Sequence, residues 1–123
     1  MSDTVITIHN VQVLVCGVDG KKLTSEGDAL DLIGETMYSG IELVIIPMER
    51  FEDDFFQLKT GLAGQIVQKF VTYRRHLVIL GDISRHIAHS RAFKDFVYEA
   101  NRGTQVWFTT SLQELNERLN HTQ

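Results

Sequence analysis

Two short, largely apolar runs constrain the fold of this chain more than any other feature. They are residues 41–46 (Ile-Glu-Leu-Val-Ile-Ile) and residues 77–80 (Leu-Val-Ile-Leu). Both are rich in β-branched residues and short, so we interpret them as strands that are covered on both faces. Pro47 ends the first run, because proline cannot donate a hydrogen bond within a sheet. Since a helical pattern follows each run, the sequence predicts a parallel arrangement with right-handed crossovers.

The segments around these runs complete the pattern. Residues 5–8 and 11–16 are typical of an antiparallel hairpin, and His9-Asn10 supplies its turn because asparagine tolerates the left-handed conformation. Residues 105–109 form the last predicted strand. Helices are predicted where a capping residue precedes apolar residues spaced by three or four; they cover residues 25–40, 52–59, 61–74, 90–103 and the segment from Ser111 onward.

The same spacing predicts which helical side chains are buried. The expected inward-facing residues are Leu30, Ile33 and Met37; Phe55, Leu58, Leu62, Ile66, Phe70 and Tyr73; Ala92, Phe93, Phe96, Val97 and Ala100; and Leu112, Leu115 and Leu119. Gly40 and Gly103 are expected to end helices, Gly103 with a positive φ. Gly61 and Gly64 interrupt the longest helical pattern, and we expect them to allow close packing on the sheet or on a partner.

The predicted order of elements is β-β-α-β-α-β-α-β-α. It describes an α/β fold in which helices pack on a mixed sheet of about five strands. A chain of 123 residues has the length of one domain, so we assign residues 1–123 to a single domain.

Composition and charge argue against several classes of protein. Twelve Lys and Arg against sixteen Asp and Glu give a net charge of −4, which does not suit a general nucleic-acid binder. No apolar run approaches the roughly 20 residues of a membrane span. The first residues lack a basic region leading a hydrophobic stretch, so we expect a cytoplasmic protein without a secretory signal. The glycines form neither a dinucleotide-binding nor a P-loop motif, and no cofactor is expected.

The stretch after the third predicted strand resembles a known signalling motif. Residues 58–64 read Leu-Lys-Thr-Gly-Leu-Ala-Gly. The STAS domain of sulfate-transporter tails and anti-sigma-factor antagonists carries Asp-Ser-Ser-Gly-Leu-Gly here, and its order of elements is similar. In that family a serine of the motif is phosphorylated to switch a partner on or off. The resemblance implies a STAS-like fold with Thr60 at the second serine, while Leu58 replaces the aspartate and Lys59 the first serine.

Five blocks of sequence resemble a small bacterial family, domain of unknown function 4180. The blocks are residues 28–33, 54–64, 68–73, 81–83 and 99–103. This resemblance implies a cytoplasmic bacterial protein with a STAS-like fold. The family carries no assigned reaction, so the resemblance implies none for this chain.

Polar residues follow three of the predicted strands, at the edge where parallel α/β sheets bind ligands. The residues expected there are Glu49, Arg50, Asp53, Asp82, Ser84 and Thr110. Asp82 could orient a substrate hydroxyl, hold a cation or act as a base. In the alternative interpretation, Asp82 and Ser84 form turn hydrogen bonds and Arg50 pairs with a neighbouring carboxylate. Since no second carboxylate is fixed beside Asp82, the sequence names no catalytic residue.

Three aromatic residues, Phe51, Phe55 and Phe56, lie close together among acidic residues. If one of them is exposed, it marks a contact surface that would also include Thr60 and Gly61. In the alternative, Phe51 packs under the loop while Phe55 and Phe56 divide between the sheet and a neighbouring helix.

Two further features are weaker indications of chemistry. His86 and His89 could share a metal if they lay on one helical turn, but Ser90 as the next helix start places both in a loop, and no metal site is predicted. The single cysteine, Cys16, is expected to be a small buried residue rather than a nucleophile.

Three classes of function therefore remain. The first is a non-enzymatic regulatory or interaction module that uses residues 50–64 to bind a protein partner or to form a homodimer. The second is a small-ligand binder at the strand-end edge, using Arg50, Asp82 and Ser84. The third is an enzyme at the same edge, for which no nucleophile–base pair can be named. An exposed Phe55 or Phe56 favours interaction, whereas a concave pocket around Asp82 favours a ligand or chemistry.

Overall fold

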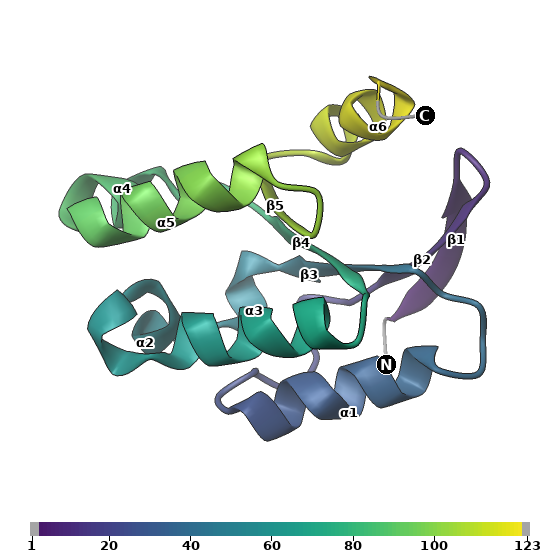
Figure 1. The fold of residues 1–123 in the computed structure, drawn as a ribbon, viewed down its shortest axis with the longest axis horizontal. Coiled ribbons are helices and arrows are strands. Elements are labelled where there is room, and N and C mark those ends of the chain that lie inside the picture. The colour runs from purple at the N-terminus through teal and green to yellow at the C-terminus, as the bar shows by residue number, and fades with distance from the viewer. Residues whose placement is uncertain (1–2, 122–123) are drawn as a thin grey trace.

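The computed structural model describes residues 3–121 and shows a five-stranded sheet with helices on both faces (Figure 1). The strands are β1 (Thr4–Ile8), β2 (Val11–Val15), β3 (Leu43–Pro47), β4 (His76–Leu80) and β5 (Val106–Thr109). The helices are α1 (Glu26–Thr36), α2 (Asp53–Phe56), α3 (Leu62–Thr72), α4 (Ser84–His89), α5 (Arg91–Arg102) and α6 (Leu112–His121), with 3₁₀ turns η1 (Met48–Arg50) and η2 (Leu58–Thr60). The predicted α/β class with a mixed five-stranded sheet is confirmed.

The strands lie in the sheet in the order in which they occur along the chain. β1 and β2 form the antiparallel hairpin, and β2 to β5 run parallel to one another. His9 and Asn10 both have a positive φ, which is typical of the predicted two-residue turn. Pro47 is the last residue of β3 and lies opposite Leu80. β1 and β5 are therefore the two edges of the sheet.

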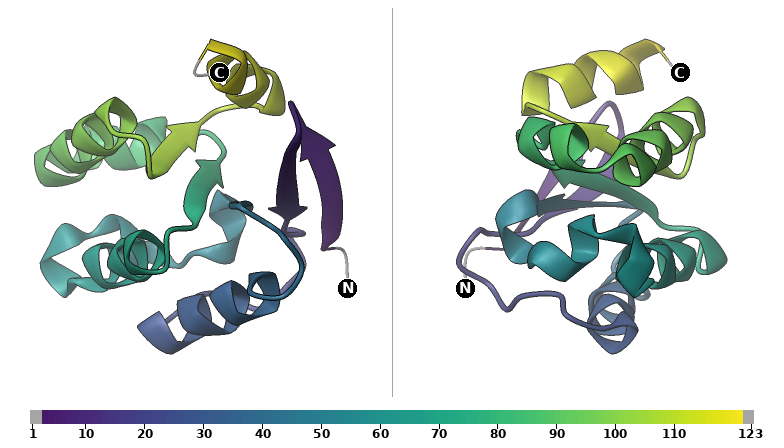
Figure 2. Two further views of the ribbon diagram at one scale, coloured as in Figure 1. Left: turned by 45° about the vertical axis from the view of Figure 1, so that its right-hand side comes forward. Right: turned by 90° about the vertical axis from the view of Figure 1, so that its left-hand side faces the viewer.

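Alternating side chains divide the sheet between two cores, and helices lie on both of its faces (Figure 2). On one face, α1, α3 and α5 pack against residues such as Val44, Ile46 and Leu77. On the other face, α6 is the one helix among residues 3–121 that covers Val13, Leu43, Ile45, Val78 and Trp107, and it does so with Leu115 and Leu119. The central strands are buried on both faces because of this double cover, as their uninterrupted apolar character predicts.

Three serines begin helices as the sequence predicts. The Ser25 hydroxyl accepts a hydrogen bond from the Asp28 amide at 3.4 Å, and the Ser90 hydroxyl accepts one from the Phe93 amide at 3.1 Å. Ser111 caps α6 in the same way, 3.1 Å from the Glu114 amide. Each cap satisfies an amide that has no partner within its own helix.

Several burial predictions are wrong. Those for Leu30, Met37, Tyr73, Ala92 and Leu112 fail, because these side chains are exposed. In α1 the buried stripe is Ala29, Leu32, Ile33 and Thr36. The small Ala29 and the polar Thr36 contribute little to a hydrophobic pattern. The predicted buried stripe of this helix is therefore displaced by one residue toward the C-terminus at both of its ends.

The glycines and one helix also differ from expectation. Gly103 ends α5 with a φ of −87°, so a positive φ is not needed there. Gly61 has a φ of +80° and separates η2 from α3, whereas Gly64 lies within α3. A side-chain carbon at either position would meet open space, so neither glycine serves close packing within the chain, and packing on a partner stays a prediction. The segment predicted as a loop before Ser90 contains α4.

Candidate functional site

The predicted ligand residue Arg50 is buried and holds a loop in place. Its Nε donates to the Lys21 carbonyl at 2.6 Å and its Nη1 to the Gly17 carbonyl at 2.9 Å. Asp3 lies 3.8 Å from the same Nη1, so Arg50 does pair with a neighbouring carboxylate. A side-chain carbon at Gly20 would lie 2.4 Å from this guanidinium, so the close approach requires glycine. Arg50 thus fastens the segment between β2 and α1 to the end of η1.

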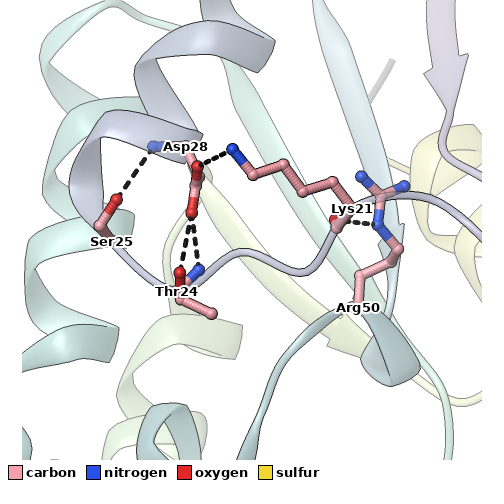
Figure 3. Close-up of polar contacts among 5 residues, drawn as sticks. All are labelled: Lys21, Thr24, Ser25, Asp28 and Arg50. Carbon is pink, nitrogen blue, oxygen red and sulfur yellow. Dashed lines mark hydrogen bonds and ion pairs between the residues drawn. The ribbon is translucent and has the colours of Figure 1, made fainter.

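The charges beside this loop are paired as well (Figure 3). Asp28 accepts hydrogen bonds from the Thr24 amide at 2.8 Å and the Thr24 hydroxyl at 3.2 Å, and its carboxylate lies 3.0 Å from the Lys21 ammonium. Chiefly because of the Thr24 amide, the pKa of Asp28 falls to about 2. Lys22 donates to the Glu49 carbonyl at 2.6 Å. Arg50, Lys21 and Asp28 border a hollow of about 100 Å³. Their contacts are with other groups of the same chain, and these contacts stabilise the loop between β2 and α1.

The other predicted edge residues form local turn and cap interactions. The Asp82 carboxylate accepts a hydrogen bond from the Ser84 amide at 3.0 Å, and this bond lowers the pKa of Asp82. The Thr110 amide donates to the Glu114 carboxylate at 2.8 Å, at the start of α6. The turn interpretation therefore describes Asp82 and Ser84, and the predicted residues do not converge on one cavity.

A larger hollow of about 470 Å³ lies between α2 and α4, beyond the carboxyl ends of β3 and β4. Its lining includes Asp53, Gln57, Arg85, His86 and His89. The His86 ring stacks on Phe56 with ring centroids 3.8 Å apart and planes 9° from parallel. Burial lowers the pKa of His86, so its imidazole is mainly neutral at pH 7. The sequence missed this combination because α4 was taken for a loop.

The structure gives no support for metal or thiol chemistry. Within residues 3–121 no group of three His, Cys, Asp or Glu side chains is arranged to hold a metal ion. Cys16 is buried, and burial raises its pKa to about 12, as expected for a structural rather than a reactive thiol.

The aromatic cluster is buried, which corrects the prediction of an exposed phenylalanine. Phe51, Phe55 and Phe56 are at most 4% exposed. The Phe51 and Phe55 rings contact each other with centroids 4.1 Å apart and planes tilted by 30°, and the ring of Phe93 in α5 lies edge-on to Phe56 at 5.5 Å. The sequence could not show this cover, because it comes from Phe93 of α5, 37 residues further along the chain than Phe56.

Thr60 and Gly61 remain at the surface, next to the buried aromatic cluster. The Thr60 hydroxyl lies 2.7 Å from the Asp54 carbonyl and 2.9 Å from the Gln57 carbonyl, where it closes η2. It also accepts a hydrogen bond from the Leu62 amide at 3.3 Å. The hydroxyl is therefore part of the junction between η2 and α3.

The strongest candidate for a contact surface is the β1 edge, which the sequence did not single out. Thr4 to Thr7 are exposed, including 55% of Val5 and 38% of Ile6. Figure 1 and the left view of Figure 2 show β1 at the end of the sheet, and none of the described helices lies beyond it. A hollow of about 400 Å³ lies between this strand and α6, lined on the helix side by Leu112, Gln113 and Asn116.

Comparisons with known proteins identify the family but no function. None of the described helices is both long and apolar enough to span a bilayer. No curated protein and no solved structure matches the chain. One family model, Domain of unknown function (DUF4180), matches residues 8–119, which is most of the chain. The chain therefore belongs to the DUF4180 family, as its sequence blocks indicate.

Proposed function

We propose that this protein is a non-enzymatic regulatory or protein-interaction module, and that its partner adds a strand at β1. The open β1 edge is the observation that carries the proposal. Its five residues read Thr-Val-Ile-Thr-Ile, without a charge or a proline. Strand edges in soluble proteins are usually protected by such residues, because unpaired backbone groups attract other strands. An unprotected edge of this kind suits a partner that binds by strand addition.

The charged residues near the strand-end edge do not support the alternative of an enzyme. Arg50, Asp28 and Asp82 have partners within the chain, and those partners belong to loops and caps. Cys16 lies buried with a raised pKa. These groups stabilise the fold, so they lend no support to a catalytic role.

The regulatory part of the proposal rests on Thr60 and on the STAS-like order of elements. Phosphorylation would remove the hydroxyl hydrogen that the Asp54 and Gln57 carbonyls share. It would also place a dianion against these two carbonyl oxygens, whose negative partial charge would repel it and destabilise the turn. A cytoplasmic bacterial signalling setting is part of this proposal.

Native mass spectrometry of the protein purified from its own kind of host tests the interaction. The variant Thr7→Pro removes one outward-facing amide, and Thr7→Ala retains it. We expect wild type and Thr7→Ala to carry a stoichiometric protein partner or a second copy, and Thr7→Pro to be a bare monomer. A wild-type protein that is itself a bare monomer would overturn the proposal, and so would an unchanged assembly of Thr7→Pro. A mass increase of one phosphate would direct attention to Thr60.

A second candidate function is the binding of a small ligand in the hollow between α2 and α4. The observation that favours it is the set of Arg85, His86 and His89 around a space of about 470 Å³ at the carboxyl edge of the sheet. A stoichiometric small adduct that is lost in Arg85→Ala and retained in Arg91→Ala would support it. Absence of any adduct from the native protein would count against it.

A further inference from the structure

We infer that the strand added at β1 is β1 of a second copy of this chain, in an antiparallel pair with Ile6 on the two-fold axis. This inference rests on the proposed function and names the partner. The resulting dimer has one continuous sheet of ten strands. It is isologous, because each copy offers the same five residues to the other.

The hairpin determines which backbone groups of β1 point outward. Ile8 and Val11 flank the two-residue turn and lie opposite each other. In such a turn the first carbonyl accepts a hydrogen bond from the fourth residue's amide, so Ile8 and Val11 are a hydrogen-bonded pair. Since bonded and non-bonded pairs alternate along an antiparallel ladder, Ile6 and Thr4 also bond to β2. The amides and carbonyls of Val5 and Thr7 therefore point to the open edge.

Self-pairing about Ile6 uses all of these outward groups. Val5 lies opposite Thr7 of the second copy, and the two residues exchange hydrogen bonds. Ile6 lies opposite Ile6 in a non-bonded pair. A shift that centres the pair on Val5 would place Thr7 opposite Asp3, and a shift to Thr7 would place Val5 opposite His9. The register about Ile6 is thus the one that pairs every residue of β1 with β1.

Side chains and charge favour the same register. The two Ile6 side chains meet on the face covered by α6, beside the hollow that the 46% exposed Leu112 borders. On the opposite face the 55% exposed Val5 packs against a threonine methyl group. No charged residue lies within the paired segment, and at each of its ends Asp3 faces His9 of the second copy. The pairing therefore covers apolar surface without opposing like charges.

Cysteine cross-linking tests the register directly. In a non-bonded antiparallel pair the two α-carbons are about 4.5 Å apart, which is within the range that a disulfide requires. We expect Ile6→Cys to form a covalent dimer on mild oxidation of the purified chain. The matched control Val5→Cys lies two residues from its own copy, about 8 Å away, and cannot be bridged. The native Cys16 is buried and is the same in both variants.

Light scattering of the purified chain tests the dimer without a cross-link. Wild type and Thr7→Ala are expected to have the dimer mass. Thr7→Pro and Ile6→Lys are expected to have the monomer mass at the same concentration, with an unchanged circular dichroism spectrum. Two variants are used because the proline could unfold β1, whereas Ile6→Lys keeps every amide and places two ammonium groups on the axis.

The outcomes separate this inference from the proposed function. A monomeric wild type overturns the self-pairing. If Thr7→Pro also removes a different protein from the assembly isolated from cells, the interaction module stands with another partner. A covalent dimer of Val5→Cys in place of Ile6→Cys overturns the register, and a dimeric Ile6→Lys overturns the placement on β1.

Discussion

The two edges of the sheet are protected to very different degrees. At β5 the Phe108 amide, which faces away from β4, donates to the Asn101 side chain at 2.7 Å. Arg118 of α6 lies over the Trp107 ring at 4.0 Å and donates to the Asn101 carbonyl. At β1 none of the described helices lies beyond the strand (Figure 1), and Thr4 to Thr7 are exposed. One edge is closed by its own chain, and the other is open.

This difference indicates that a sheet of this size can protect an edge strand, so the small size of the sheet does not explain the exposure of β1. The chain closes β5 with one side-chain amide from α5 and one arginine from α6. The same chemistry would suffice at β1, where Lys or Pro alone would discourage pairing. The contrast can be tested at each edge separately, beginning with the largest expected effect.

Removal of Trp107 should cause the largest loss of stability. Trp107 is 2% exposed and its indole donates to the Gly103 carbonyl at 2.8 Å. Truncation of a buried aromatic residue of this size costs about 3–5 kcal/mol. We expect Trp107→Ala to lower the free energy of unfolding by that amount in urea titrations. Ile6→Ala at the open edge, measured at a protein concentration at which the chain is monomeric, should cost less than about 1.5 kcal/mol. Equal losses at the two edges would contradict the comparison.

Removal of the Asn101 side chain should have an intermediate effect. Asn101→Ala leaves the part-buried Phe108 amide without its acceptor, at a cost of about 1–3 kcal/mol. Asn101→Asp keeps an oxygen acceptor and serves as the matched control. Hydrogen exchange supplies the comparison between edges. The Phe108 amide of wild type should exchange slowly, whereas the amides of Val5 and Thr7 should exchange rapidly in the Ile6→Lys monomer.

Acid should weaken the β5 side of the sheet through His76. This residue begins β4, and its ring lies edge-on to Trp107 at 5.6 Å between centroids. Burial lowers its pKa below the ordinary 6.5, although the nearby Glu42 opposes the shift. Below pH 6.5 the unfolded chain therefore binds a proton more readily than the folded chain, and the free energy of unfolding falls as the pH falls. Above pH 6.5 this contribution is constant.

The variant His76→Gln checks the assignment of this pH dependence. It should flatten the fall in unfolding free energy between pH 6.5 and pH 5, as followed by urea titration. The lowered pKa of His86 acts in the same direction, so His86→Gln is measured beside it. An unchanged slope in His76→Gln would exclude His76 as a source.

The smallest effect is expected at Val5. This side chain is 55% exposed and lies on β1, the edge strand beyond which none of the described helices lies. Val5→Thr keeps the β-branched shape and every backbone group, so the free energy of unfolding should change by no more than about 0.5 kcal/mol. The same substitution should leave the dimer mass unchanged, because the pairing depends on the backbone groups of Val5. A monomeric Val5→Thr would show that the side chain, rather than the edge, determines association.

Patterns within short windows predicted much of the fold. The apolar strands, the serine caps and the positive-φ hairpin turn are properties of a few neighbouring residues, and all were found where they were expected. The start of α5 at Ser90 is an example, since its hydroxyl bonds three residues further on. The burial predictions failed where one local pattern fitted two different sets of inward-facing side chains. Leu30 and Met37 suited a helical stripe as well as Ala29 and Thr36 did.

The candidate sites were predicted less well than the fold. The sequence placed Arg50 at a ligand edge, but its guanidinium binds the Gly17 carbonyl, 33 residues away along the chain. Phe56 was expected in a contact surface, but α4 and α5 cover it. In both cases the partner comes from a distant segment, and no local pattern in the sequence identifies it.

The sequence by itself thus determined the α/β class, the identity of the strands and the beginnings of the capped helices, because backbone hydrogen bonding and hydrophobic period act over a few residues. Only the tertiary structure decided which strands became edges and which edge was closed. That choice depends on the crossovers that place β1 and β5 at opposite ends of the sheet. It also depends on the helix packing that brings Asn101 and Arg118 to β5 and leaves β1 uncovered, which is why the site proposed for interaction became visible only in the folded chain.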